Sequence, residues 1–457
     1  MVLSAVMSLR GVLSARALAP PSGGAAFLSS ENRRQVSGDG APKSRWESVL
    51  DGLTVMCLLS AVVVFAGFPE LAPRGLWIVC GVLVWRIWGG AAPSLFLADY
   101  AVLGLSVAYV LQLVVARRGN SYSGFVAAFA GMGLYWLLRT ARCKPVVHER
   151  VLVNLAMGSV LLSCSAIVYS VAWMHDLQRA GFQEFSPMKA TLSSVLGGRI
   201  NEWATLALQG LVFQVACLSP NLRLSKWQNV VGLVGIGLTS AAIWLTFSRG
   251  AYVALGAVFG ILFGYALLGV RSGSRVILMA AAVVLLSAVV SNSAAHGGVL
   301  KTAGLHRTEQ QRRSSGSRLG VWSGAVHLAF EHPILGSGPG TFAMRFVPYA
   351  RLGEYRPFVS RPLNTPLAVF FEEGVLGLAG YTVLLAGLLK CARPSLLANG
   401  ADAGFKSAML SSGLLALLVK ETVFSSFLEF PAVACLFWVS AATVVNLAEE
   451  RGGRTGV

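Results

Sequence analysis

Arginine is the residue type in this sequence whose number and spacing best suit chemistry. The polar segment 294–364 contains eight arginines and one lysine against three glutamates, a balance of +6. Arginine binds phosphate groups through two parallel hydrogen bonds and keeps its charge when it is partly buried. The segment therefore predicts one of two things: a binding site for an anionic ligand, or a solvated surface that meets acidic lipid headgroups.

A further arginine stands between two apolar runs. Arg249 follows the run 228–247 within the sequence Ser248-Arg249-Gly250, and another apolar run follows it. An ionisable residue at a membrane boundary is costly to place and indicates function, although an arginine can also extend to the headgroups from a purely structural position. Gly250 would allow a tight turn and the close approach of a phosphate group.

Histidines supply the other candidates for acid–base chemistry. His306, His327 and His332 lie in the same polar segment, and an imidazole titrates near neutral pH. The stretch GSGPGTF at 336–342 resembles a dinucleotide-binding fingerprint only superficially, because Pro339 interrupts it and no βαβ unit surrounds it. We expect a tight turn there, under the roof of an active site.

The sequence contains no recognisable motif for a metal or a cofactor. It has no HExxH, Walker A or G-x-S-x-G sequence and no DxD-like acidic pair, and its seven cysteines form no CxxC. We therefore expect no metal, no cofactor and no disulfide framework. Without a metal, arginines would have to stabilise any phosphate leaving group.

The composition predicts a protein whose solvent is the lipid bilayer. Hydrophobic residues make up 55% of the 457 residues and charged residues only 12%, and the mean hydropathy is +0.66. Soluble domains carry about 25% charged residues. The net charge of +17 would suit nucleic acid in a soluble protein, but here cationic loops that meet anionic lipids explain it better. We expect membrane lipids, and no nucleic acid, among the partners.

Apolar runs near the length that crosses a bilayer, about 20 residues, recur along the chain. They are 52–69, 71–88, 95–116, 122–139, 151–173, 201–219, 228–247, 250–270, 275–293, 365–389, 405–424 and 427–447. The predicted fold is an all-α integral membrane protein with about 12 transmembrane helices. Helices 1–9 occupy 51–293, one long outer loop occupies 294–364 between helices 9 and 10, and helices 10–12 occupy 365–447.

Lysine and arginine in the short loops predict the orientation. Both tails are basic, and the loops near residues 142–150, 223–226, 271–275 and 390–406 are richer in these residues than the alternate loops, although Arg117 and Arg118 dissent. Both termini are therefore predicted to be cytoplasmic, with segment 294–364 on the outer face. Residues 1–50 read as a flexible basic tail, with an organellar import signal as the alternative, and 448–457 as a short cytoplasmic tail.

Several segments together resemble the O-antigen ligase and polymerase family. The stretch SRLGVWSGAVHLAFEHPILGSGPGTF at 317–342 closely resembles the family's hallmark loop, and TFSRGAY at 246–252 resembles its Ser-Arg-Gly turn. LNTPLAVFFEEGVLG at 363–377 resembles the opening of the helix that follows the loop, and GRINEWA at 198–204 is a weaker match. The matching hallmark residues are Arg318, Trp322, Ala325, His332, Pro333, Gly336, Gly338, Gly340 and Phe342.

The resemblance implies a membrane glycosyltransferase of the GT-C type. Such an enzyme transfers a glycan from an undecaprenyl-diphosphate carrier to lipid A core, another glycan or a protein, at the periplasmic face of the bacterial inner membrane. The resemblance implies that Arg249 and Arg318 hold the diphosphate and that they converge with the helix that carries Asn364 and Glu372. The predicted catalytic residues are Arg249, Arg318, Glu372 and His332, and the predicted substrate-binding residues are Arg249, Arg318, Trp322, Arg361, Asn364 and Glu373.

One position departs from the family pattern. Leu363 stands where the family has the histidine that activates the acceptor hydroxyl, and a leucine cannot take a proton. Three outcomes stay open: another base such as Glu372, Glu373 or His332 serves, the reaction needs no strong base, or the protein is catalytically altered. The alternatives from other classes are a transporter or flippase for lipid-linked or anionic solutes, and a non-catalytic scaffold.

Overall fold

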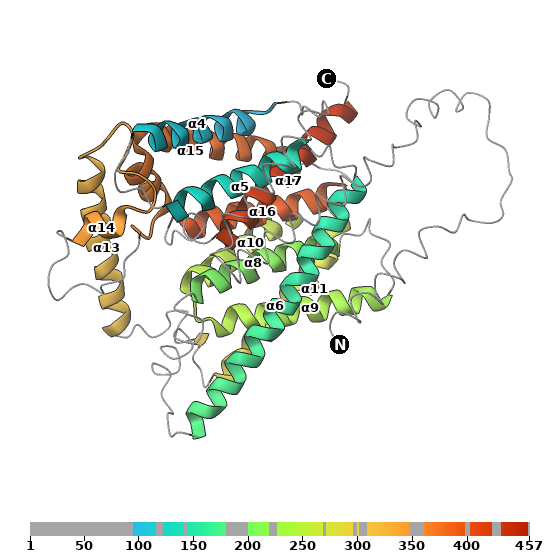
Figure 1. Ribbon diagram of the computed structural model, residues 1–457. Coiled ribbons are helices and arrows are strands. Elements are labelled where there is room, and N and C mark those ends of the chain that lie inside the picture. Colours follow the sequence, from blue (N-terminus) through green and yellow to red (C-terminus); the bar gives the residue numbers. More distant parts are fainter. Residues whose placement is uncertain are drawn as a thin grey trace, which may run out of the picture. The chain divides into compact units, whose positions relative to one another are not determined.

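The structure is a computed structural model in which the described residues are almost entirely helical (Figure 1). It describes residues 95–115, 122–140, 145–179, 200–218, 226–267, 271–295, 299–300, 309–347, 361–397, 403–422 and 431–455. All of these belong to one compact unit, Leu50–Val457. Within these ranges no strand is present.

Ten of the described helices coincide with ten predicted transmembrane runs. They are α4 (Leu97–Val115), α5 (Tyr122–Thr140), α6 (Pro145–Arg179), α8 (Ile200–Cys217), α9 (Lys226–Leu245), α10 (Arg249–Leu267), α11 (Arg271–Ala294), α15 (Thr365–Leu397), α16 (Ala403–Glu421) and α17 (Pro431–Thr455). The predicted helices 52–69 and 71–88 and the N-terminal tail lie outside the described residues. The predicted all-helical class is confirmed, whereas the count of about 12 membrane spans stays a prediction.

The lengths and compositions of several described helices are those of membrane-spanning helices. Three described segments are long and apolar enough to cross it, namely Ser274–Ala294, Thr365–Arg393 and Val433–Glu450. Four shorter apolar segments accompany them, namely Leu97–Gln112, Leu152–Val168, Asn229–Leu245 and Arg249–Gly264. Helices satisfy every backbone group internally, which is why apolar runs in lipid fold as helices. Large apolar side chains such as Leu285, Leu286, Val289 and Val290 of α11 are exposed, as expected of a surface that faces lipid.

Small residues allow the helices to approach closely. α15 packs along α4, and α17 packs along α5, as Figure 1 also shows. A β-carbon on Gly387 of α15 would lie 2.6 Å from the backbone nitrogen of Ala98, and one on Gly131 of α5 would lie 2.2 Å from the Trp438 ring. Such contacts are typical of helices that pack in lipid.

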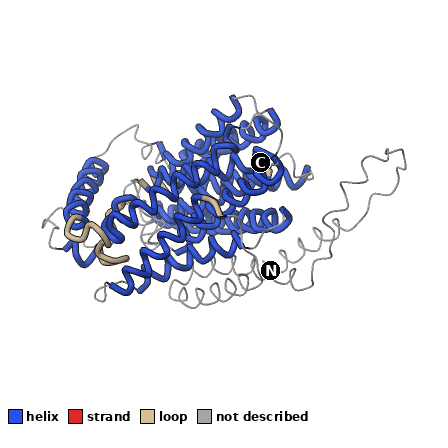
Figure 2. Tube along the Cα trace, turned by 90° about the horizontal axis from the view of Figure 1, so that it is seen from above, coloured by secondary structure: helices blue, strands red, loops and turns tan. Residues whose placement is uncertain are grey.

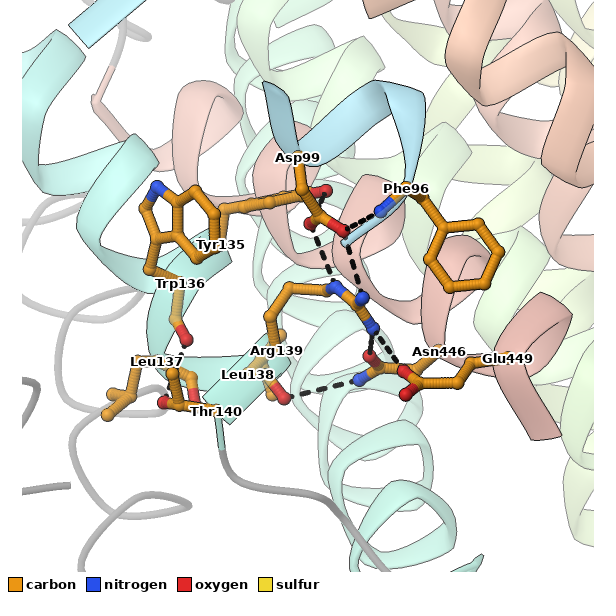
Figure 3. Close-up of polar contacts among 10 residues, drawn as sticks. All are labelled: Phe96, Asp99, Tyr135, Trp136, Leu137, Leu138, Arg139, Thr140, Asn446 and Glu449. Carbon is orange, nitrogen blue, oxygen red and sulfur yellow. Dashed lines mark hydrogen bonds and ion pairs between the residues drawn. The ribbon is translucent and has the colours of Figure 1, made fainter. Parts of the chain in front are cut away.

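A buried polar network joins α4, α5 and α17 at one end of the bundle (Figure 3). Arg139 donates hydrogen bonds from Nε and Nη2 to the two carboxylate oxygens of Asp99, each at 2.9 Å, and its Nη1 lies 2.8 Å from Glu449. Arg139 also donates to Asn446, and the Tyr135 hydroxyl donates to Asp99 at 2.7 Å. A buried charge is tolerable only when it is paired in this way, so the network holds three helix ends together.

Segment 294–364 contains two further helices, α13 (Glu309–Ala329) and α14 (Phe342–Phe346). Figure 1 shows α13 running across the end of the bundle rather than along it, and Figure 2 shows the largest described loop, in tan, at that same end. One face of α13 packs into a small core of its own. That core consists of Val321, Ala325, Leu328, Ala329, Phe342, Phe346 and Phe371.

Candidate active site

The Ser248-Arg249-Gly250 turn connects α9 to α10. Phe247 turns the chain with a φ of 52°, and the Ser248 hydroxyl accepts a hydrogen bond from the Ala251 amide at 3.4 Å, which caps α10. The same hydroxyl donates to Oδ1 of Asn201, at the start of α8, at 2.7 Å. Arg249 thus occupies the first turn of α10, where the helix dipole favours an anion and disfavours a cation. An arginine at this position and the helix end together favour a bound anion.

Arg318 of α13 lies near Arg249, although 69 positions separate them in the sequence. Partial burial, and then the charge of Arg249, lower the pKa of the Arg318 guanidinium from its usual range. Among the described residues, neither arginine forms an ion pair with a carboxylate. Two like charges held close together without an acidic partner have the charge and the donors that suit a bound anion.

The glycine-rich loop that follows α13 is attached to α15 by backbone hydrogen bonds. The Ser337 amide donates to the Phe371 carbonyl at 2.8 Å, and the Gly338 amide donates to the Glu372 carbonyl at 2.9 Å. In return, the Val375 amide donates to the Pro333 carbonyl at 2.7 Å. These bonds replace the helical bonds that α15 loses at Gly374, where φ is 67° and the helix is kinked. The loop and the kink therefore form one unit.

Two glycines make this contact possible. A β-carbon on Gly336 would lie 2.3 Å from the Glu372 carbonyl, and one on Gly374 would lie 2.3 Å from the Ile334 carbonyl oxygen. Both residues also have a positive φ, of 73° and 67°, which other residues rarely adopt. The predicted tight turn is confirmed, and the glycines serve backbone packing.

The Glu372 side chain binds the glycine-rich loop. Its Oε1 accepts a hydrogen bond from the Gly340 amide at 3.1 Å and lies 3.6 Å from Nε of Arg361. Both side chains are almost completely buried. A carboxylate that is buried, paired and hydrogen-bonded is poorly suited to take a proton from a substrate.

Three buried side-chain donors near these elements have no partner in the described part of the chain. They are Nη1 of Arg361, Nε1 of Trp322 and the hydroxyl of Ser337. An unsatisfied buried donor is costly, so such groups often await a ligand. Arg361 and Trp322 are two of the predicted substrate-binding residues.

Glu373 points elsewhere. It lines an internal cavity together with Tyr109 of α4, Met132 of α5 and Trp438 of α17. Most of the other residues that line this cavity are apolar. Although Glu373 is adjacent to Glu372 in sequence, successive helical residues point to different faces. The structure therefore gives the two adjacent carboxylates different neighbours.

Asn364 and Leu363 lie at the start of α15. The Asn364 side chain accepts a hydrogen bond from the Leu367 amide at 2.9 Å, which caps the helix, and donates to the Thr422 carbonyl at 2.7 Å. Leu363 has a φ of 57°, a left-handed conformation that is rare for a bulky residue and several-fold more common for His or Asn. The backbone at this position thus favours the histidine that the family pattern contains. His332, by contrast, is exposed, and its carbonyl accepts a hydrogen bond from the Gly336 amide at 2.9 Å.

Sequence reasoning missed a buried ionic cluster behind the turn. Lys420 and Glu421, at the end of α16, lie 3.4 Å apart with fully buried side chains, and the Thr365 hydroxyl donates to Glu421 at 3.2 Å. Lys420 also lies behind Gly250: a β-carbon on Gly250 would be 3.7 Å from Lys420 Cγ. The negative charge of Glu202 also acts on the Lys420 ammonium. Ionisable residues inside an apolar run were the available signal.

Comparison with known families agrees with the resemblance. Residues 234–382 match the family model described as O-Antigen ligase. The match runs from α9 to the middle of α15 and includes every predicted site residue. A comparison with curated proteins found no match.

Proposed function

We propose that this chain, which carries an O-antigen ligase family domain over residues 234–382, transfers a glycan from an undecaprenyl-diphosphate carrier. The acceptor is a lipid such as lipid A core, another glycan or a protein. The site opens at the periplasmic face of the bacterial inner membrane, and the fold is of the GT-C type with about 12 membrane spans. Metal and cofactor have no role in the proposed reaction.

The proximity of Arg249 and Arg318 carries this proposal. The burial and the like charge that lower the pKa of Arg318 make the site costly without an anion and favourable with one. A diphosphate brings several negative charges to one place, and arginine binds such groups with two hydrogen bonds at a time. The unpaired Arg361 and Trp322 nitrogens supply additional donors.

In the proposed reaction, an acceptor hydroxyl oxygen attacks the anomeric carbon of the donor sugar. The new carbon–oxygen bond forms as the bond to the carrier diphosphate breaks, and the electron pair leaves with the diphosphate. Arg249 and Arg318 stabilise that departing charge and are already in place before the reaction. Because Glu372 is paired and Glu373 faces an internal cavity, the hydroxyl proton passes to water or to the exposed His332. Catalysis therefore relies mainly on the leaving group.

Transfer of a labelled glycan in proteoliposomes tests the proposal. Arg249→Lys and Arg318→Lys keep the charge but lose the paired hydrogen bonds, and we expect each to lower the rate by about 10²–10³. Arg393→Lys, at the exposed opposite end of α15, is the matched control and should leave the rate unchanged. If Arg318→Lys transfers glycan as fast as the parent, the diphosphate role is wrong. If both arginines can be replaced by alanine without effect while solute uptake is measurable, the chain is a transporter.

A further inference from the structure

Apolar side chains are exposed beside the glycine-rich loop, in a segment expected to lie outside the membrane. Phe330 and Ile334 are each 65% exposed, and Val326 on the same face of α13 is 42% exposed. Apolar surface left in water costs about 25 cal/mol per Å². A contiguous group of such side chains marks a surface that is covered by something else.

Hydrogen bonds connect this surface to a membrane span. The Leu376 amide lies 3.5 Å from the Ile334 carbonyl, next to the shorter bond between Val375 and Pro333. Val375 and Leu376 have exposed side chains and belong to the span Thr365–Arg393. Phe330 packs edge-to-face on Phe370 of the same helix, with ring centroids 5.6 Å apart. The apolar surface of the loop is therefore continuous with the lipid-facing surface of α15.

Distances along two helices from their predicted cytoplasmic ends indicate that the loop lies within the depth of the bilayer. Lys390 is at the predicted cytoplasmic end of α15. Gly374 precedes it by about 16 residues, which is about 24 Å at about 1.5 Å per residue. Gln112, which donates to the Leu335 carbonyl at 2.7 Å, follows Asp99 by about 13 residues, or about 20 Å along α4. Both lengths are shorter than the hydrocarbon thickness of about 30 Å.

We propose that Phe330 and Ile334, with Val326, enter the acyl-chain region of the outer leaflet. The loop 330–335 then acts as an anchor that fixes α13 at the membrane interface, and the exposed Glu331 and His332 lie at headgroup level, as in interfacial segments that mix apolar and polar side chains. The anchor holds Arg318, further along α13, close to the plane of lipid phosphate groups. This inference does not depend on the proposed glycan transfer.

Spin labels measure the depth directly. In a variant with its native cysteines replaced, a nitroxide is attached at position 330, 334 or 176 in proteoliposomes of phosphatidylethanolamine and phosphatidylglycerol. Asp176 is the water-exposed control, because its side chain is 70% exposed and it lies about 8 residues, or about 12 Å, beyond the apolar segment Leu152–Val168 of α6. We expect oxygen to relax the labels at 330 and 334 more than a water-soluble nickel complex does, and the reverse at 176.

A second measurement keeps the native cysteines, in case the cysteine-free chain fails to fold. Benzoylphenylalanine in place of Phe330 should crosslink to phospholipid on illumination and gain the mass of one lipid, whereas the same group at Asp176 should not. Labels at 330 and 334 that are as accessible to nickel as the label at 176 would overturn the proposal. Crosslinking of position 330 to a second protein chain instead of lipid would overturn it as well.

Discussion

Gly336 of the glycine-rich loop lies against the backbone of α15 beside Gly374. Neither position has room for a side chain, because the backbone of the other segment fills the space where a β-carbon would lie. A β-carbon at either position would come within 2.3 Å of backbone atoms. Close backbone contact explains why glycines appear both in the loop motif and in the helix that follows it. It also couples the loop with the helix that carries Glu372.

Substituting either glycine should disrupt this contact. Gly336→Ala and Gly374→Ala add a steric clash, which costs about 1–3 kcal/mol, to a left-handed backbone strain of about 1–2 kcal/mol. We expect a lower unfolding temperature in detergent and little glycan transfer. Gly260→Ala in α10 is the control, because a β-carbon there meets nothing within 4 Å and alanine favours helix. Equal stability of the Gly260 and Gly374 variants would contradict the packing role.

Leu363 provides a test of the missing base. Both Leu363→His and Leu363→Asn suit the left-handed backbone better than leucine, and we expect either to raise the unfolding temperature slightly. Only histidine can accept a proton, so only Leu363→His should raise the transfer rate, by up to about 10²–10⁴ if the base limits the reaction. The gain should disappear below pH of about 6.5, where imidazole is protonated. A similar gain with asparagine would assign the effect to the backbone alone.

The two adjacent glutamates should respond differently to neutralisation. Glu372→Gln leaves the buried Arg361 without its ion-pair partner, a change that typically costs about 3–5 kcal/mol. Glu373→Gln keeps the shape of a side chain that faces an internal cavity, so we expect a small effect. Thermal unfolding of the two purified variants compares them directly. A larger loss for Glu373→Gln would reverse the assignment of structural roles.

The buried cluster behind Arg249 should show strong coupling. Lys420→Met removes the cation beside the buried Glu421 carboxylate, and Glu421→Gln removes the carboxylate beside the buried Lys420 ammonium, so each should cost about 3–5 kcal/mol. Removing both charges leaves less unpaired charge in the interior. The double variant should therefore be more stable than the sum of the two single losses predicts. A double-mutant cycle measures this coupling. Strict additivity of the two losses would show that Lys420 and Glu421 do not stabilise one another.

The sequence alone was sufficient for the helical class and for the position of most described helices. In lipid the backbone must satisfy its own hydrogen bonds, so an apolar run long enough to cross the bilayer can form only a helix. Alternation of such runs predicts that Arg249 and Asn364 lie on one side of the membrane. Motif order added the resemblance to the O-antigen ligase and polymerase family, because the Ser-Arg-Gly turn and the arginine of segment 294–364 follow one another at characteristic places. The O-antigen ligase family model matches residues 234–382.

Only the tertiary structure decided what the individual site residues contact. It paired Glu372 with Arg361, turned Glu373 toward a cavity lined by α4, α5 and α17, and placed Lys420 behind Gly250. It also gave Leu363 its left-handed backbone. Hydropathy and motifs report on each segment separately, whereas these contacts join segments up to hundreds of residues apart. They depend on how side chains from different helices fill one shared space, which no single segment specifies.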